Sequence, residues 1–503
     1  MAEELNGVPP PHPSPGGRGC NRELQSLTPA IIGGGYAGMA AAVELAAQGI
    51  PVTVFESARQ LGGRARGVRV PNSVQRRENQ VSPSIQLSTR EEYTGGYPAA
   101  SQRPFRSPTG GKGDRPLTGD HLILDNGQHL LLGCYRETLR LIEQVGGNIE
   151  QDFLRLPLQL DLHGKFSLRA PCLPAPLHLL VALLKAQGLT WSERMKAVRF
   201  MLRLRGMDFR LPEDMTVTAL LSQNGQNANL TLKLWEPLCI AALNTPIGKA
   251  SAQVLLNVLR DALNRTRADS DMLLPRIDFT ALFPQRAAAF IEQNGGKVNL
   301  SCGVDVIVPK DEGIELVAAN ETLFFSHVIC AAPATVAAKL LRPIAALADI
   351  VAQIEALDHQ PIYTVYLQYP AHVTLPHPML GLHRRLSQWL FDKGQIADQP
   401  GLLAAVISAE GIHQELSQEQ LAQKVIAELG EEFGITEAPE WFKVIAEKRA
   451  TFCCAPDLQR PAQQTTLPNL LLAGDYTAGD YPATLEGAVL SGIRCAGLIT
   501  GQR

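Results

Sequence analysis

Three glycines in the segment Ile31-Ile32-Gly33-Gly34-Gly35-Tyr36-Ala37-Gly38 have the spacing G-x-G-x-x-G. At this spacing Gly33 permits a tight turn, Gly35 lets a phosphate approach the backbone, and Gly38 lets a helix pack closely on a sheet. A helix that begins at Ala37 would offer its unpaired N–H groups to a pyrophosphate. The pattern therefore predicts a dinucleotide-binding turn.

The residues around this turn complete a strand–helix–strand unit. Ala30–Ile32 and Val52–Phe55 are short apolar runs typical of strands, and Ala37–Gln48 is rich in helix-forming residues. Glu56 follows the second strand, 18 residues after Gly38, where a carboxylate can bind ribose hydroxyls. Because an acid there disfavours a 2′-phosphate, we expect a ligand similar to NAD or FAD, and not NADP.

Two further segments favour FAD over NAD. Leu61-Gly62-Gly63-Arg64 offers a second glycine turn that ends in a cation suited to a diphosphate. Near the other end of the chain, the expected strand Leu470–Ala473 leads to Gly474 and Asp475, and Tyr481–Ala488 begins an expected helix. Together these features resemble the amine oxidase and phytoene desaturase superfamily of flavoproteins.

This resemblance implies the contacts of FAD along the chain. Glu56 and the Gly62–Arg64 turn would hold the adenosine and pyrophosphate, Gly474 and Asp475 the ribitol and phosphate, and the helix that follows would lie by the isoalloxazine. Val304 would contact the adenine. The FAD-binding residues expected in all are Gly33, Gly35, Tyr36, Ala37, Gly38, Glu56, Gly62, Gly63, Arg64, Gln128, Val304, Gly474, Asp475, Glu486, Gly487 and Ala488.

A second dinucleotide motif for a nicotinamide is missing. Gly110-Gly111-Lys112-Gly113 has no strand before it and lies in a segment rich in Pro, Gly, Ser and Arg. The electrons must therefore come from a substrate, from dioxygen or from an external carrier.

Four segments narrow the resemblance further. Leu124–Gly133, Leu234–Leu238, Ala241–Pro246 and Gly479–Ala488 together resemble the hydroxysqualene dehydroxylases, the squalene-associated FAD-dependent enzymes of hopanoid synthesis. The resemblance runs from about Pro29 to the C-terminus and excludes residues 71–119. It implies reductive removal of the hydroxyl of hydroxysqualene to give squalene, water and oxidised flavin. A C30 isoprenoid substrate, an external electron donor and contact with other squalene-synthesis enzymes follow from it.

The same reaction needs a proton donor near the flavin. The candidates are Asp125 and His129, in the DNGQH segment that runs beside the flavin in the superfamily, and Asp480 and Tyr481, before the last helix. His129 is the favoured donor, and Gln128 is expected to hydrogen-bond the flavin. The alternative is that Asp125 and His129 only brace a turn.

The order of the expected elements indicates an α/β protein with a Rossmann-like FAD-binding domain, assembled from separated segments around an inserted domain of helices and sheet. We expect strands at Lys297–Val308 and Leu323–Cys330 and mostly helix over 151–281. The expected limits are a disordered tail (1–27), the FAD domain (28–70, 120–150, 282–334 and 461–503), a disordered insertion (71–119) and the substrate domain (151–281 and 335–460).

The composition excludes several other classes of protein. The net charge of -3 argues against a dedicated nucleic-acid binder, and the nine scattered cysteines form no CxxC pair, so neither a disulfide framework nor a metal site is expected. No secretory signal and no membrane span is visible, which makes the cytoplasm the expected compartment. An amine oxidase would need an aromatic cage, which disagrees with 6% aromatic residues. Three alternatives stay open: a carotenoid-type desaturase or isomerase, an amine oxidase on the same scaffold, and a non-catalytic flavin-binding partner.

A stretch in the expected substrate domain suits a membrane surface. Leu177–Leu184 is apolar, and Trp191, Met195, Val198 and Leu202 follow at helical spacing. Lys196, Arg199 and Arg203 form a basic face on the same stretch, which suits anionic headgroups. We expect either peripheral contact with the inner face of the cell membrane or an ordinary packed helix pair with a solvated basic side.

Overall fold

The computed structural model describes residues 27–71 and 121–501. Apart from Leu27 and Pro71, the expected tail (1–27) and the expected insertion (71–119) lie outside the described residues. Of the described residues, 27–67 and 125–501 form one compact unit, and 68–71 and 121–124 belong to a second. Strands β3 (Gly67–Pro71) and β4 (His121–Asp125), which belong mostly to the second unit, pair with each other. All that follows concerns the first unit.

The glycine turn follows the middle strand of a five-stranded parallel sheet. In spatial order its strands are β10 (Lys297–Asn299), β2 (Thr53–Phe55), β1 (Pro29–Ile32), β14 (His327–Cys330) and β20 (Leu470–Leu472). Strands β1 and β20 are buried at every position, as expected for a parallel sheet covered on both faces. This sheet confirms the expected Rossmann-like fold and its assembly from segments far apart in the chain.

Two of the expected strands are divided in the structure. The run Lys297–Val308 separates into β10 and β11 (Val304–Lys310), because Ser301 has a left-handed backbone conformation with a φ of 53° that no strand accommodates. The run Leu323–Cys330 separates at Ser326, whose N–H donates to the carbonyl oxygen of Thr28. The antiparallel sheet that results consists of β11, β12 (Gly313–Ala318) and β13 (Glu321–Phe325).

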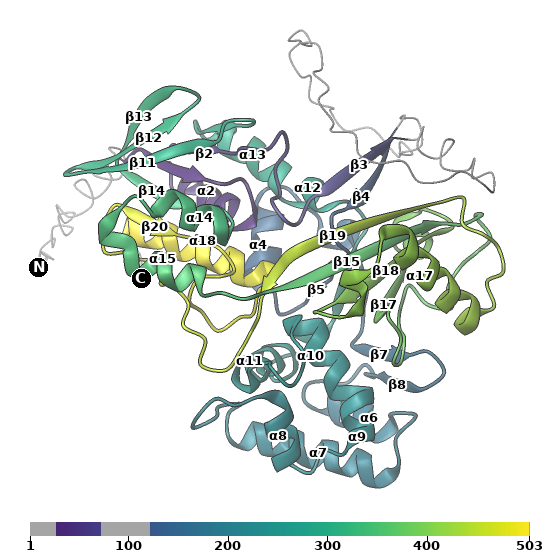
Figure 1. Cartoon of the computed structure of the whole chain (residues 1–503). Coiled ribbons are helices and arrows are strands. Elements are labelled where there is room, and N and C mark those ends of the chain that lie inside the picture. Colours follow the sequence, from purple (N-terminus) through teal and green to yellow (C-terminus); the bar gives the residue numbers. More distant parts are fainter. Residues whose placement is uncertain (1–26, 72–120, 502–503) are drawn as a thin grey trace, which may run out of the picture. The chain divides into compact units, whose positions relative to one another are not determined.

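Helix α2 (Tyr36–Ala47) is the central helix of this region and packs against α18 (Leu485–Thr500) and α13 (Pro284–Gln293). Figure 1 shows α18 lying along α2. A Cβ at Gly492 of α18 would lie only 2.1 Å from the carbonyl oxygen of Ala37, so the two helices approach this closely because residue 492 has no side chain. The contact places the first turns of α2 near the C-terminal helix.

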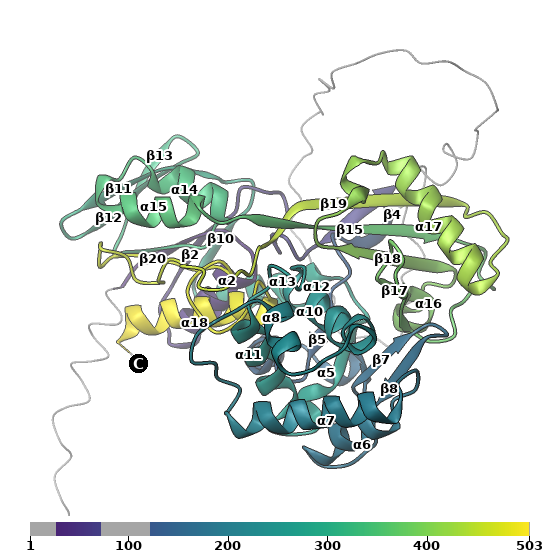
Figure 2. The same cartoon turned by 60° about the horizontal axis from the view of Figure 1, so that its bottom comes forward.

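A second large sheet has seven strands. Its order is β19 (Trp441–Phe452), β15 (His359–Gln368), β18 (Leu402–Ser408), β17 (Trp389–Asp392), β16 (Met379–Gly381), β7 (Gln159–Leu162) and β8 (Phe166–Arg169). Helix α17 (Gln418–Phe433) covers part of it and buries Leu421, Val425 and Leu429 against the strands. Figure 2 shows α17 beside β15, β18 and β19.

The expectation of mostly helix over 151–281 is correct only after residue 170, because β6 (Phe153–Leu156), β7 and β8 come first. The helices that follow are α6 (Leu177–Lys185), α7 (Trp191–Gly206), α8 (Val217–Gln223), α9 (Ala228–Leu230), α10 (Glu236–Leu243) and α11 (Ala252–Leu263). The other elements used below are α4 (Arg136–Gln144), α12 (Phe279–Leu282), α14 (Ala334–Leu341) and α16 (Lys393–Ala397). In the part of the chain that the structure describes, none of the helices is both long enough and apolar enough to cross a membrane. The residue limits between an FAD domain and a substrate domain stay a prediction.

Candidate FAD site

The first glycine turn has the geometry that its spacing predicts. Gly33 has a φ of 111°, and a Cβ on it would lie 2.6 Å from the carbonyl oxygen of Ala331. A Cβ on Gly38 would lie 2.0 Å from the carbonyl oxygen of Gly33. Both positions therefore need glycine for the fold itself.

Gly35 differs from Gly33 and Gly38 because the fold itself does not require a glycine at this position. Its φ is -81° and its ψ -179°, which any residue adopts, and a Cβ there would meet only the Cα of Gly63, at 3.8 Å. Open space thus faces the backbone of Gly35 at the start of α2. No side chain caps this helix start, and no acid lies in its first turn. The backbone N–H groups in the first turn of α2 are therefore free to bind a pyrophosphate. The start of this helix and Gly35 thus fit the diphosphate of FAD.

The second glycine turn lies directly beside the first. The N–H of Gly62 donates to the carbonyl oxygen of Gly34 at 2.9 Å, and Gly35 and Gly62 pair as a short parallel bridge. Gly62 and Gly63 have φ values of 113° and 61°, a conformation that favours glycine. The two turns, separate in the sequence, therefore form one cradle of backbone.

Glu56 and Val304 mark the expected adenosine end of the site. The carboxylate of Glu56 is buried and accepts from the N–H of Gly34 at 2.7 Å and of Ala58 at 2.8 Å. These bonds fix its orientation and leave lone pairs for ribose hydroxyls. The carbonyl oxygen of Glu56 accepts from the N–H of Cys302, which brings the start of β11, with Val304, to the same place.

Arg64 links this cradle to the C-terminal segment. Its guanidinium forms an ion pair with Asp475 and donates to the carbonyl oxygen of Ala450 at 2.6 Å. Asp475 follows Gly474, whose N–H donates to the hydroxyl of Ser491 in α18 at 2.8 Å. Because Asp475 already holds Arg64, the direct contact of Arg64 with a diphosphate stays a prediction.

The start of α18 is fixed to the start of α4. Both carboxylate oxygens of Glu486 accept from α4, from the N–H groups of Glu137 at 3.0 Å and Thr138 at 2.9 Å. The side chain of Glu486 is thus a buried cap of a neighbouring helix, and burial raises its pKa. Glu486 therefore has a structural role that the sequence around it does not reveal. The expected contacts of Glu486, Gly487 and Ala488 with FAD are not tested by this geometry.

Asp125 and Gln128 lie in a buried polar cluster with a lysine. Asp125 is 4% exposed, its Oδ1 accepts from the N–H of Phe279 at 3.0 Å, and its carbonyl oxygen accepts from the hydroxyl of Tyr366. Gln128 Oε1 accepts from the ammonium of Lys393 at 3.4 Å, and Lys393 is itself 6% exposed. Burial raises the pKa of Asp125 to about 6, although the charge of Lys393 and the bond from Phe279 each lower it.

His129 belongs to the same cluster through an aromatic contact. Its ring meets that of Phe279 edge-on, with centroids 5.0 Å apart, and Tyr36 packs on the same Phe279 and donates to its carbonyl oxygen. Burial and then the charge of Arg64 lower the pKa of His129 to about 4. A histidine with this pKa is almost wholly neutral near pH 7, which disfavours the expectation that His129 is the proton donor.

Asp480 and Tyr481 lie in a different setting. The side chain of Asp480 is 73% exposed, and its Oδ2 is 3.9 Å from Nη2 of Arg260 in α11. The ring of Tyr481 meets that of Tyr135 edge-on at 6.4 Å, and burial raises its pKa. Neither residue joins the Asp125 cluster, and the exposed Asp480 is poorly placed for chemistry that excludes water.

The sequence did not reveal two members of the cluster, Lys393 and Phe279. Lys393 begins α16, 265 residues from Gln128, and Phe279 begins α12, 243 residues from Tyr36. The sequence does offer a signal for the start of this helix, because Asp392 follows the apolar run Trp389–Phe391 and caps the helix by accepting from the N–H groups of Gly394 and Gln395. Nothing in the sequence shows that Lys393, the next residue, is buried.

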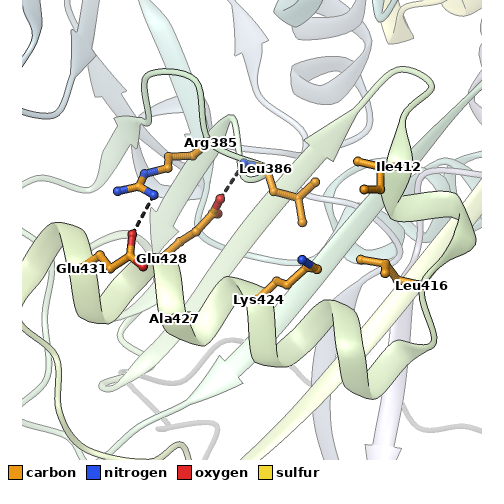
Figure 3. Close-up of a pocket in the computed structure, with 8 residues that line it drawn as sticks. All are labelled: Arg385, Leu386, Ile412, Leu416, Lys424, Ala427, Glu428 and Glu431. Carbon is orange, nitrogen blue, oxygen red and sulfur yellow. Dashed lines mark hydrogen bonds and ion pairs between the residues drawn. The ribbon is translucent and has the colours of Figure 1, made fainter.

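The structure also contains a surface cavity of about 530 Å³, shown in Figure 3. It is lined by Leu386, Ile412 and Leu416 and by polar residues of α17. Glu428 accepts from the N–H of Leu386 at 2.6 Å, and Glu431 pairs with Arg385. None of the expected site residues lines this cavity, so it is separate from the FAD site.

The parallel sheet, the paired glycine turns and the acid after β2 together define the dinucleotide-binding site of a Rossmann-like fold. In agreement, residues 108–500 match the family of flavin containing amine oxidoreductases, and residues 31–88 match a NAD(P)-binding Rossmann-like domain. The chain therefore belongs to the flavin containing amine oxidoreductase family, and its cofactor is FAD.

Individual relatives agree with this family. The hydroxysqualene dehydroxylase of Sinorhizobium fredii is 26% identical over 94% of this chain and 98% of its own length. The zeta-carotene desaturase of Arabidopsis thaliana is 24% identical over 98% of this chain and 88% of its own. An oxidoreductase structure from Methanosarcina mazei superposes with a TM-score of 0.66 at 15% identity, over 93% of this chain and 99% of that chain, which shows a shared fold. The resemblance to hydroxysqualene dehydroxylases that the sequence motifs predicted is thus confirmed.

Proposed function

We propose that this protein reductively removes the hydroxyl of hydroxysqualene and forms squalene and water. The observation that carries the proposal is a buried acid, Asp125, whose pKa of about 6 lets it hold a proton near neutral pH. Replacement of a hydroxyl by hydrogen needs a proton for the departing oxygen, whereas a desaturation does not. The similarity to hydroxysqualene dehydroxylases over nearly the whole chain supports the same reaction.

The reaction consumes one hydride equivalent and one proton for each hydroxyl that leaves as water. Reduced FAD supplies the hydride equivalent when it is bound. The residues of the chain bind the diphosphate through the paired glycine turns, orient the ribose through Glu56, and deliver the proton. An external electron carrier of unknown class completes the cycle, because the chain offers no second nucleotide motif.

Asp125 is a better proton donor than His129 in this environment. At pH 7 a carboxyl with a pKa of about 6 is protonated in about one molecule in ten, but a histidine with a pKa of about 4 in only about one in a thousand. Oδ1 of Asp125 accepts from the N–H of Phe279, so Oδ2 is the oxygen that would carry the proton. Lys393 tunes the acid, since its positive charge favours the ionised carboxylate.

Two other functions compete with this proposal. The similarity to zeta-carotene desaturases favours a carotenoid-type desaturase that runs the same scaffold in the oxidative direction. A non-catalytic flavin-binding partner of an isoprenoid complex is the second. The proposed enzyme acts in the cytoplasm on a C30 isoprenoid, close to the other enzymes of squalene synthesis.

A parallel assay separates the three functions. The FAD-loaded protein is incubated with hydroxysqualene under reducing, anaerobic conditions, and with zeta-carotene and phytoene under oxidising conditions, and the products are identified by mass spectrometry. We expect squalene in the first reaction and no change in the others. Desaturated carotenoids would support the desaturase, and no product from any substrate, with FAD fully bound, would support the non-catalytic partner.

A further inference from the structure

The outer face of helix α7 combines exposed apolar and basic side chains. Trp191 is 64% and Leu202 61% exposed, and the half-buried Met195 lies between them at helical spacing. Arg199 and Arg203 are exposed beside them. We call Trp191, Leu202, Arg199 and Arg203 the α7 surface. An exposed tryptophan and leucine on one helix face are unusual for a side that only meets water.

The structure corrects the expected faces of this helix. Val198, expected on the apolar face, is 5% exposed and belongs to the core with Phe200 and Leu204. Phe200 packs edge-on against the buried Trp235, with centroids 5.2 Å apart, which docks the helix on the protein. The apolar and basic residues that remain outside therefore lie together on one surface.

The charge of α7 favours an anionic partner. The helix carries five basic residues and only one acid, Glu193, in a chain whose net charge is -3. Glu193 faces inward: despite burial, hydrogen bonds from Thr190, Asn229 and Asn227 lower its pKa to about 2. Arg199 and Arg203 form no ion pair with any acid in the described parts of the chain. Their charges are thus available to a partner.

We infer that the α7 surface binds the surface of an anionic lipid bilayer. A membrane–water interface takes indole and leucine side chains at the headgroup level while arginines pair with phosphates, and the α7 surface offers these groups together. A protein partner would need an acidic patch for the arginines and a matching apolar pocket for Trp191 and Leu202, whereas an anionic bilayer offers both along its whole surface. The inference rests on exposure and charge and not on the proposed reaction, but a membrane-bound enzyme could take an apolar substrate directly from the bilayer.

Trp191 makes this inference testable at a single residue. The chain has four tryptophans, and the other three, Trp235, Trp389 and Trp441, are buried. A blue shift of tryptophan emission upon addition of vesicles therefore reports the environment of Trp191. The experiment uses the full-length, FAD-loaded protein with phosphatidylcholine vesicles, with and without phosphatidylglycerol, in cosedimentation and fluorescence titrations.

We expect binding and a blue shift with vesicles that contain phosphatidylglycerol, weakened by salt, and little of either with phosphatidylcholine alone. Arg199→Gln combined with Arg203→Gln should lower the partition coefficient about 10- to 30-fold, at about 1 kcal/mol per charge. Trp191→Ala combined with Leu202→Ala should weaken binding by a similar factor.

Matched controls remove the same groups elsewhere. Lys339→Gln combined with Lys424→Gln removes two exposed charges from α14 and α17, and Ile412→Ala removes a side chain that is 65% exposed. These variants should bind vesicles like the wild type. Equal loss in the control and α7 variants would overturn the inference, as would no binding to either vesicle type or unchanged Trp191 emission. Because binding is measured without substrate, these outcomes are independent of whether the proposed reaction occurs.

Discussion

Gly35→Ala should separate FAD binding from folding. The Cβ of the new alanine would be 3.8 Å from the nearest protein atom, the Cα of Gly63, and the φ of -81° suits alanine. We therefore expect the unfolding free energy of the apoprotein to change by less than about 1 kcal/mol. The methyl group would instead occupy the space where the pyrophosphate approaches the backbone.

The loss of affinity follows from the hydrogen bonds that the methyl group prevents. A hydrogen bond to a charged group contributes about 2 kcal/mol, so losing one weakens FAD binding about 30-fold and losing two about 1000-fold. Fluorescence titration of the apoprotein with FAD measures this directly. Gly206→Ala is the matched control, since a Cβ there meets nothing within 4 Å on the distant helix α7. Gly35→Ala protein that binds FAD as tightly as the wild type would refute the placement of the pyrophosphate.

Three further substitutions test other parts of the site. Lys393→Met removes the positive charge that favours the ionised form of Asp125, so the apparent pKa of this acid should rise from about 6 by about one unit. Turnover at pH 8 should therefore increase. A pH–rate profile in which the rate is lower than that of the wild type at every pH would contradict this prediction. Arg64→Ala leaves the carboxylate of Asp475 buried without its partner and should lower the free energy of unfolding, measured by chemical denaturation, by about 3 kcal/mol. Arg64→Lys should recover part of this loss. Glu486→Ala removes the acceptor for two N–H groups of α4 and should lower stability by about 2 kcal/mol, and a thermal melt identical to the wild type would show that the cap contributes nothing.

The FAD cradle could be predicted from the sequence because its chemistry is local. The spacing of Gly33, Gly35 and Gly38 and the position of Glu56 determine a turn, a helix start and an acid at the end of the next strand, with no long-range information. The glycine pair Gly62 and Gly63 predicts the second turn in the same way. Its hydrogen bond to Gly34 then followed from the fold.

The Asp125 cluster could not be predicted in the same way, because it depends on burial and on contacts between residues far apart in the sequence. Asp125 and His129 were both candidates, but only the packing around them sets their pKa values, and it moves these in opposite directions. Lys393 reaches Gln128 across 265 residues, a distance over which no local pattern carries information. The left-handed Ser301 likewise divides a continuous β-prone run that periodicity alone reads as one strand.

The most direct test of the proposed function is an anaerobic single turnover. The FAD-loaded protein is photoreduced, mixed with hydroxysqualene, and followed by flavin absorbance while squalene is quantified in the same sample. We expect one squalene for each flavin reoxidised, at a rate that falls as the pH rises above about 6 because Asp125 loses its proton. Flavin that stays reduced in the presence of hydroxysqualene, or reoxidises without forming squalene, would contradict the proposed function.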